Sequence, residues 1–334
     1  MKKLSVYIPI LVLCISFFTV LNSHAQDIHF SQYNQAPARL NPALTGQFKG
    51  TYRVAGIYRS QWASVSVPYS TIAFSGDAHN FMKQEGLGVG LDFYFDKAGD
   101  GNLGTLHFNG SGSYTIQVSH THKNTLTGGL QFGYGQRQID QSQLQFGNQN
   151  GGGGSVESFS SNTSYFNLNT GLVWQTKLAP RKIIEAGIAL HNLTQPNINF
   201  YANDAYRLDL RFSIHAKYQF SISQKVDLIP SVLIMKQGPH QQLTPGINGK
   251  YILDGRSHHY RALYMGLWTR VGDAGFMSVG MDWNNLNVGL SYDITYSDFN
   301  VASRYRGGFE LSFIYIFREA QPARQYYKTC PDYI

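Results

Sequence analysis

Four ionisable side chains share one face of a predicted strand and are the residues best placed to do chemistry: Asp209, Arg211, His215 and Lys217. Catalysis would need a nucleophile, a base and oxyanion donors that converge on one point, and no Ser or Cys nucleophile motif accompanies this set. We interpret the set, with Glu185 and Asp92 on other strands, as charges that balance each other in the wet interior of a barrel. The sequence therefore predicts a protein without enzymatic activity.

Three other motifs could bind a phosphate or a metal, but none has the spacing that such a site needs. The glycine run at 151–154 follows no strand-to-helix turn and has no nearby Lys-Ser/Thr pair, so it does not fit a phosphate loop. The turn at 96–102 lacks the closing Glu of a calcium loop, and His258-His259 lacks zinc spacing. We expect no cofactor and no metal. The loop that holds Asn148 and the glycine run is instead a candidate extracellular contact surface.

Apolar and polar residues alternate strictly along most of the chain, which is the period of a β-strand with one apolar and one polar face. The clearest apolar stripe is Leu208, Leu210, Phe212, Ile214, Ala216, Tyr218 and Phe220. We expect strands near 51–60, 68–78, 86–96, 104–118, 124–137, 164–176, 181–191, 206–220, 225–236, 240–253, 259–271, 274–284, 285–296 and 307–317.

The length of these strands distinguishes between two all-β architectures. Strands of a soluble sandwich are roughly 5–6 residues long, because its core is only about 10 Å thick. A tilted strand of about 9–11 residues is what an outer-membrane barrel needs. The sequence predicts an all-β, transmembrane antiparallel β-barrel of about 14 strands over residues 49–317.

The lengths of the predicted connections indicate the topology. Counted from the first strand, the even connections are short, and the odd ones include the three longest, at 138–163, 192–205 and 297–306. Outer-membrane barrels have short periplasmic turns and long extracellular loops. We therefore expect both termini to be periplasmic.

The chain begins with the features of a secretory signal peptide, which we place at residues 1–25. Lys2 and Lys3 precede an apolar run, and Ser23-His24-Ala25 resembles a cleavage site. Cys330 would then be the only cysteine of the mature chain, so we expect no internal disulfide. The positive charge is modest and is not clustered into basic blocks, which argues against nucleic acid as a partner.

Aromatic residues gather near the predicted strand ends, where they are typical of the girdles that lie at membrane interfaces. The set comprises Tyr58, Trp62, Tyr69, Phe93, Phe95, Tyr134, Trp174, Trp268, Trp283 and Tyr296.

Two segments do not alternate and lie outside the predicted barrel. Residues 26–48 contain Pro37 and Pro42, which disfavour a place inside a sheet, and we expect them to form an ordered periplasmic plug or docking segment. Residues 318–334 form a predicted periplasmic tail that could dock to a partner, although an unstructured tail fits the sequence nearly as well. An unpaired Cys330 could form a mixed disulfide with such a partner.

The order of several short motifs resembles the PorP/SprF family of outer-membrane proteins associated with type IX secretion. The motifs are QDIHFSQY at 26–33, NPALTG at 41–46, YRSQW at 58–62, PYST at 68–71, HNLTQPN at 191–197, GGFELS at 307–312 and CP at 330–331. They extend over nearly the whole predicted mature chain. One departure is Phe309, where the resemblance leads us to expect histidine.

The resemblance implies a non-enzymatic barrel of the outer membrane that serves secretion or surface attachment of large cargo, notably gliding-motility adhesins. It also implies periplasmic and lipoprotein partners from the secretion machinery, besides the outer-membrane lipids. Candidate partner contacts are Phe30, Tyr33, Asn41, Pro42, Arg59, Trp62, Asn148, Tyr326, Tyr327 and Cys330. The rival interpretation is a passive porin or small-solute channel, because a barrel of this size must be either plugged or water-filled.

Overall fold

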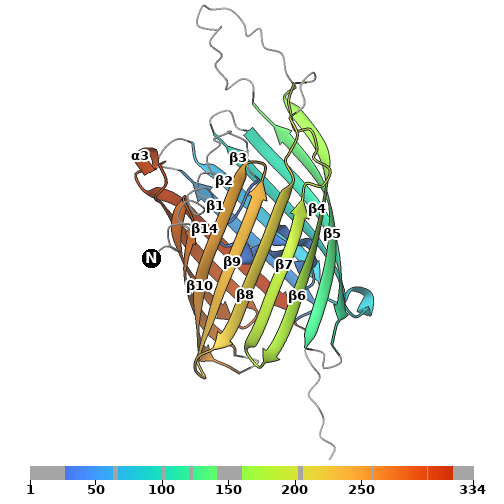
Figure 1. Cartoon of the computed structure of the whole chain (residues 1–334), viewed down its shortest axis with the longest axis vertical. Coiled ribbons are helices and arrows are strands. Elements are labelled where there is room, and N and C mark those ends of the chain that lie inside the picture. The colour runs from blue at the N-terminus through green and yellow to red at the C-terminus, as the bar shows by residue number, and fades with distance from the viewer. Residues whose placement is uncertain are drawn as a thin grey trace, which may run out of the picture.

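The computed structural model describes residues 27–62, 67–99, 103–119, 123–140, 160–201, 206–256, 259–298 and 300–318. These residues form fourteen antiparallel strands in one closed barrel, in which each strand pairs with its neighbours in the sequence (Figure 1). The strands are β1 (Tyr52–Gln61), β2 (Tyr69–Ala78), β3 (Leu87–Ala98), β4 (Leu103–Gln117), β5 (Asn124–Gln138), β6 (Asn162–Ala179), β7 (Lys182–His191), β8 (Arg211–Ser221), β9 (Val226–Gln237), β10 (His240–Asp254), β11 (Arg261–Arg270), β12 (Ala274–Trp283), β13 (Leu286–Thr295) and β14 (Arg306–Phe317).

The barrel closes where the first strand pairs with the last. The register runs without interruption from Tyr52 opposite Phe317 to Gln61 opposite Gly308. Closure removes the free strand edges, whose unpaired backbone groups could not be satisfied in lipid. The predicted all-β antiparallel barrel is therefore confirmed.

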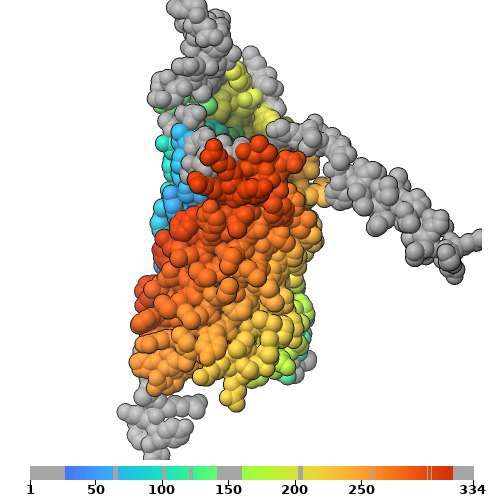
Figure 2. Space-filling view, turned by 90° about the vertical axis from the view of Figure 1, so that its left-hand side faces the viewer, coloured from blue at the N-terminus to red at the C-terminus, as the bar shows by residue number. Residues whose placement is uncertain are grey.

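The alternation seen in the sequence sorts side chains between the two faces of the wall. On β13, Leu290, Tyr292 and Ile294 are exposed on the outside, while Ser291 and Asp293 between them are buried inside. Figure 2 shows one outer face of the barrel, formed mainly by the orange and red strands toward the end of the chain. No helix within the described ranges is long and apolar enough to cross a membrane.

The connections differ in length between the two ends of the barrel, as the sequence predicts. The longest ones, at 139–161, 192–210 and 296–305, all leave the same end. We call this end the long-loop end. The opposite end, where β1 begins and β14 finishes, we call the short-turn end.

The strand predicted near 206–220 begins later than expected, at Arg211. Residues 196–198 and 206–208 instead pair with each other, through the Ile198 N–H bond to Tyr206 O and the Leu208 N–H bond to Pro196 O, both 2.9 Å long. Leu208 packs with Tyr165 and Ile198 rather than facing lipid. A local pairing within the long connection therefore interrupts the stripe that the alternation predicts.

The predicted place of Trp268 in an aromatic girdle is wrong, because this side chain faces the barrel interior and is buried. Its ring stacks on Phe276, with a centroid separation of 5.8 Å. Gly246 on the adjacent strand has no side chain, and a Cβ atom at that position would overlap the indole ring.

Candidate functional site

Residues 27–50, which we call the interior segment, lie inside the barrel. Three short helical turns bend the segment: η1 (Tyr33–Gln35), α2 (Pro37–Leu40) and η2 (Pro42–Leu44). Pro37 and Pro42 stand in the first turns of α2 and η2, where a missing N–H costs nothing. In Figure 1 the blue segment is visible within the wall.

The contacts of the interior segment show that it crosses the lumen lengthwise. At its start, the Asp27 N–H donates to Gln237 Oε1 at 2.9 Å and the Asp27 carboxylate accepts from Asn192 Nδ2 at 2.7 Å. Both partners lie at the long-loop end. Near its finish, the Gly46 N–H donates to Asp77 Oδ2 at 2.6 Å, close to the short-turn end. The described chain therefore begins at the long-loop end and finishes at the short-turn end. Asp27 and the end of β14 thus lie on opposite sides of the membrane, which disagrees with the expectation that both termini are periplasmic; a periplasmic C-terminal end stays a prediction.

Apolar side chains anchor the first half of the interior segment. Tyr33 packs edge-on against Trp268, with 5.6 Å between ring centroids. Phe30 packs in a second buried cluster with Ile57 on β1 and Tyr94 on β3. The segment is thus held by burial of aromatic surface as well as by polar contacts.

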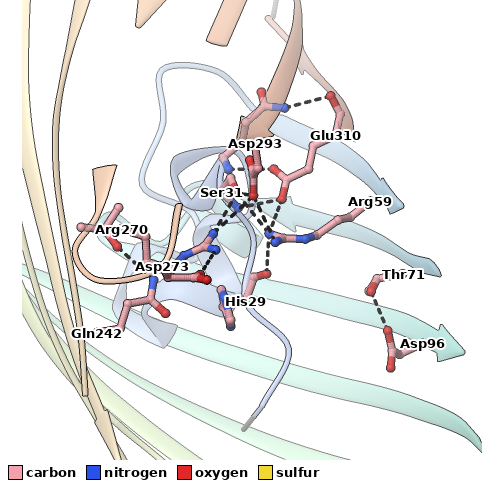
Figure 3. A network of polar contacts seen from close by, with 12 residues as sticks. His29, Ser31, Arg59, Thr71, Asp96, Gln242, Arg270, Asp273, Asp293 and Glu310 are labelled. Atoms are coloured by element: carbon pink, nitrogen blue, oxygen red, sulfur yellow. Dashed lines mark hydrogen bonds and ion pairs between the residues drawn. The ribbon is translucent and has the colours of Figure 1, made fainter. Parts of the chain in front are cut away.

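A buried ionic network joins the interior segment to four strands near the long-loop end (Figure 3). Arg59 on β1 lies 2.6 Å from the Glu310 carboxylate on β14 and 3.3 Å from the Asp293 carboxylate on β13. Arg270 on β11 lies 3.6 Å from Asp293 and donates to the Ser31 hydroxyl at 3.0 Å. Arg59 is only 1% exposed and Glu310 0%, so solvent does not screen this pair.

The Glu310 carboxylate binds the backbone of the interior segment directly. It accepts the Ser31 N–H at 2.7 Å and the Gln32 N–H at 2.8 Å, one on each oxygen. The Ser31 hydroxyl also donates to Asp293 Oδ2 at 2.7 Å. Arg270 also lies 2.7 Å from the partly exposed Asp273 carboxylate, so the network sets two arginines against three carboxylates, and its remaining hydrogen bonds hold the segment.

His29 lies beside this network and does not add to its positive charge. Burial, and then the neighbouring Arg270 and Arg59 guanidinium groups, hold the pKa of the His29 imidazole well below its usual range. The imidazole is therefore neutral at pH 7, while its backbone carbonyl accepts from Arg59 Nη1 at 2.9 Å.

Asn41 fixes the middle of the interior segment. Its side-chain oxygen accepts the Ala43 N–H at 2.9 Å and so caps η2. Its amide nitrogen donates to the carbonyls of Leu172 on β6 and Ile188 on β7, at 3.1 and 3.0 Å. The strands leave room for this side chain because Gly171 and Gly187 face it, and a Cβ atom at Gly171 would overlap its carboxamide.

We expect Asn41→Ala to lower the free energy of unfolding by about 1–3 kcal/mol, because it leaves the buried Ala43 N–H without its partner. Denaturant titration of the purified barrel in lipid vesicles measures the change. Asn34→Ala is the matched control, since Asn34 lies on an exposed part of the same segment. Equal stability of the two variants would contradict the role assigned to Asn41.

A third set of contacts holds the finish of the interior segment. Arg53 on β1 binds both oxygens of Asp77 on β2, at 2.9 and 2.6 Å, and also donates to the Leu44 carbonyl at 3.1 Å. The Ser113 hydroxyl on β4 donates to the Thr45 carbonyl at 2.6 Å. Polar contacts therefore reach the segment from strands around most of the barrel.

The structure places the predicted partner contacts in three kinds of environment. Phe30, Tyr33, Asn41, Pro42 and Arg59 are buried inside the barrel and contact this chain itself. Trp62 follows β1 and packs edge-on against Tyr69, with 4.9 Å between ring centroids. Asn148, Tyr326, Tyr327 and Cys330 lie outside the described residues, as do residues 1–26 and the glycine run at 151–154. Partner binding by these ten residues stays a prediction.

Three strand residues that bind the interior segment at Ser31 are absent from the predicted partner contacts: Arg270, Asp293 and Glu310. The available signal was an acidic or basic residue on the inward face of a strand, the same signal that marked Asp92, Glu185 and Arg211. This signal does not show which acidic residue pairs with which basic residue. Among the described residues no group of three His, Cys, Asp or Glu side chains could hold a metal ion.

Comparison with known proteins supplies a family and a fold. The family described as "Type IX secretion system membrane protein PorP/SprF" matches residues 22–315. The Ralstonia pickettii toluene transporter TbuX is similar in fold, with a TM-score of 0.52 and 9% identity over 85% of this chain and 94% of that one. The Pseudomonas putida toluene transporter TodX has a TM-score of 0.47 and 8% identity over 85% and 95% of the two chains. No curated protein matches the chain in sequence.

Proposed function

Because this chain belongs to the PorP/SprF family of type IX secretion system membrane proteins, we propose that it is a plugged outer-membrane barrel of the secretion or gliding machinery. In this proposal it engages or anchors secreted cargo, such as a surface adhesin, and contacts periplasmic and lipoprotein partners. The interior segment is the plug. Neither the family nor the fold is that of an enzyme.

The observation that carries this proposal is the occupied lumen. The interior segment is bound at its start by Gln237 and Asn192, at its middle by the backbone of β6 and β7, and at its finish by Asp77. A passive channel needs a continuous water-filled path, whereas a scaffold for other proteins does not. The likeness to hydrocarbon transporters concerns the fold alone and does not favour the rival channel.

The proposed orientation places the short-turn end in the periplasm and the long-loop end at the cell surface. In this orientation β14 ends on the periplasmic side, which agrees with the prediction that residues 318–334 form a periplasmic tail. Asp27 then faces the cell exterior, so the plug runs inward from the surface side toward β1.

Cysteine labelling tests this orientation. Gln241, at the long-loop end of β10, and Gln224, in the short connection 222–225, are both exposed. In a Cys330→Ser background, we expect a membrane-impermeant maleimide to label Gln241→Cys on intact cells and Gln224→Cys only after the outer membrane is opened. The reverse pattern would invert the proposed orientation.

The central test is a tagged pull-down from native outer membranes after mild crosslinking, read by mass spectrometry. Recovery of a large secreted adhesin or of secretion-machinery lipoproteins, in stoichiometric amounts, is the expected result. Recovery of the barrel without a stoichiometric partner, together with steady open pores in single-channel recordings, would favour the channel instead.

A further inference from the structure

The interior segment does not fill the lumen evenly. A cavity of about 450 Å³ remains on the side of β6 to β14, toward the short-turn end, and we call it the vestibule. The interior segment contributes Ser31, Gln32 and Gln35 to its lining. Its wall includes Ile183, Gln219 and Ile316, which lie within a few residues of the strand ends. The volume lies within the range of about 300–1,000 Å³ that is typical of ligand sites.

Two kinds of side chain predominate in the lining of the vestibule. The first kind is the carboxamide, supplied by Gln32, Asn34, Gln35, Gln47, Gln175, Gln219, Asn248 and Asn287. A carboxamide offers two N–H donors and an acceptor oxygen with two lone pairs, so it keeps hydrogen-bonding capacity beyond internal bonds such as those from Gln35 Nε2 to Asn287 Oδ1 at 3.1 Å and from Asn287 Nδ2 to Asp282 Oδ1 at 2.7 Å. Such a lining matches the alternating N–H and C=O groups of a polypeptide backbone.

The second kind is isoleucine, which is unexpected on the inward face of a barrel that holds water. Ile183, Ile229, Ile314 and Ile316 all line the vestibule and are only half-buried. On this face the rest of β14 carries Glu310 and Ser312. Apolar surface left in contact with water is unfavourable, and it becomes favourable when another apolar group covers it.

The charges of the vestibule are already paired within the chain. Lys217 lies 2.8 Å from Glu185, and Lys250 lies 3.8 Å from Asp282. The site therefore has no unbalanced charge that would call for a charged ligand. Of the aromatic rings that border it, Trp268 and Phe276 are buried against the wall, whereas Tyr264 is half-buried and its hydroxyl donates to Asp282 Oδ2 at 2.6 Å.

From these observations we propose that the vestibule binds an uncharged, extended polypeptide segment that carries apolar side chains, from a protein on the side where β14 ends. The carboxamides bind its backbone, and the four isoleucines receive its side chains. This inference rests on the proposed function, because it names the kind of partner segment that the plugged barrel holds.

Site-specific photocrosslinking in the native cells tests the inference. The photoreactive amino acid benzoylphenylalanine is placed at Ile314 or Gln219 inside the vestibule, and at Tyr315 as the matched control. Tyr315 follows Ile314 on β14 and faces outward. We expect adducts from the two inward positions, none from Tyr315, and crosslinked peptides that map to one uncharged segment of a single polypeptide.

A filling variant provides a second measurement. Ile314→Trp narrows the vestibule from the β14 side, and we expect it to reduce the adduct formed from Gln219 by about tenfold or more, equivalent to about 1.4 kcal/mol of binding free energy. Tyr315→Trp, on the lipid side of the same strand, should leave the Gln219 adduct unchanged.

Several outcomes would overturn the inference: no adduct from either inward position, an adduct that resists protease and is therefore lipid or glycan, or peptides scattered over many proteins. Its failure can be separated from that of the proposed function. Machinery partners recovered in the pull-down without a vestibule adduct would refute the inference alone. A mapped adduct on a barrel that recovers no secretion partner would refute the proposed function alone.

Discussion

Replacing Arg59 by alanine is expected to destabilise the barrel by about 3–5 kcal/mol and to loosen the interior segment. The substitution leaves the carboxylates of Glu310 and Asp293 buried near each other with only Arg270 close by, and Arg270 also pairs with Asp273. Removing one partner of a buried ion pair is costly, because the remaining charge can be neither solvated nor paired. Denaturant unfolding in lipid vesicles measures the loss of stability.

The chain offers a matched control for this prediction. Arg256 also lies 2.6 Å from a carboxylate, that of Asp254, but its side chain is 76% exposed. Arg256→Ala should therefore change the free energy of unfolding by less than about 1 kcal/mol. Similar losses for Arg59→Ala and Arg256→Ala would show that burial does not set the strength of the network.

The second large effect is expected from a single methyl group at Gly129 on β5. A Cβ atom there would overlap the backbone of Pro42 and Ala43, which cannot rotate away as a flexible side chain could. We expect Gly129→Ala to displace the middle of the interior segment, at a cost of about 1–3 kcal/mol. Single-channel recordings should then show openings that the unmodified protein lacks.

Gly128→Ala is the control for this experiment, because Gly128 precedes Gly129 on the same strand and faces outward. A Cβ atom at Gly128 would meet only Leu172 Cδ2, at an ordinary distance of 3.6 Å. The two variants make the same chemical change on opposite faces of one strand. If they conduct equally and unfold at the same denaturant concentration, the interior segment does not depend on close packing at Gly129.

Several features of this protein could be read directly from its sequence. Strict alternation set the number of strands and the face on which each side chain lies, because a strand has a period of two. The three longest connections all follow odd-numbered strands, which places them at one end of the barrel. The motifs at 26–33 and 307–312 indicated the family that the comparison confirms.

Other features depend on local or long-range contacts that the alternation of apolar and polar residues does not reveal. The alternating stripe from Leu208 onward overstates β8, because residues 206–208 pair with 196–198 instead. Trp268 has the residue type of a girdle residue, but alternation with the exposed Leu267 puts it on the inward face, where Tyr33 packs against it and Gly246 leaves space for its ring.

The binding of the interior segment was decided by the tertiary structure alone. Its contacts join residues far apart in the sequence, such as Ser31 with Glu310 and Asn41 with Ile188. The sequence shows that Glu310 and Gly171 occupy inward positions of their strands, because that follows from local alternation. Only closure of the barrel brings those positions around one segment, since their separation depends on the strand order and register rather than on any local pattern.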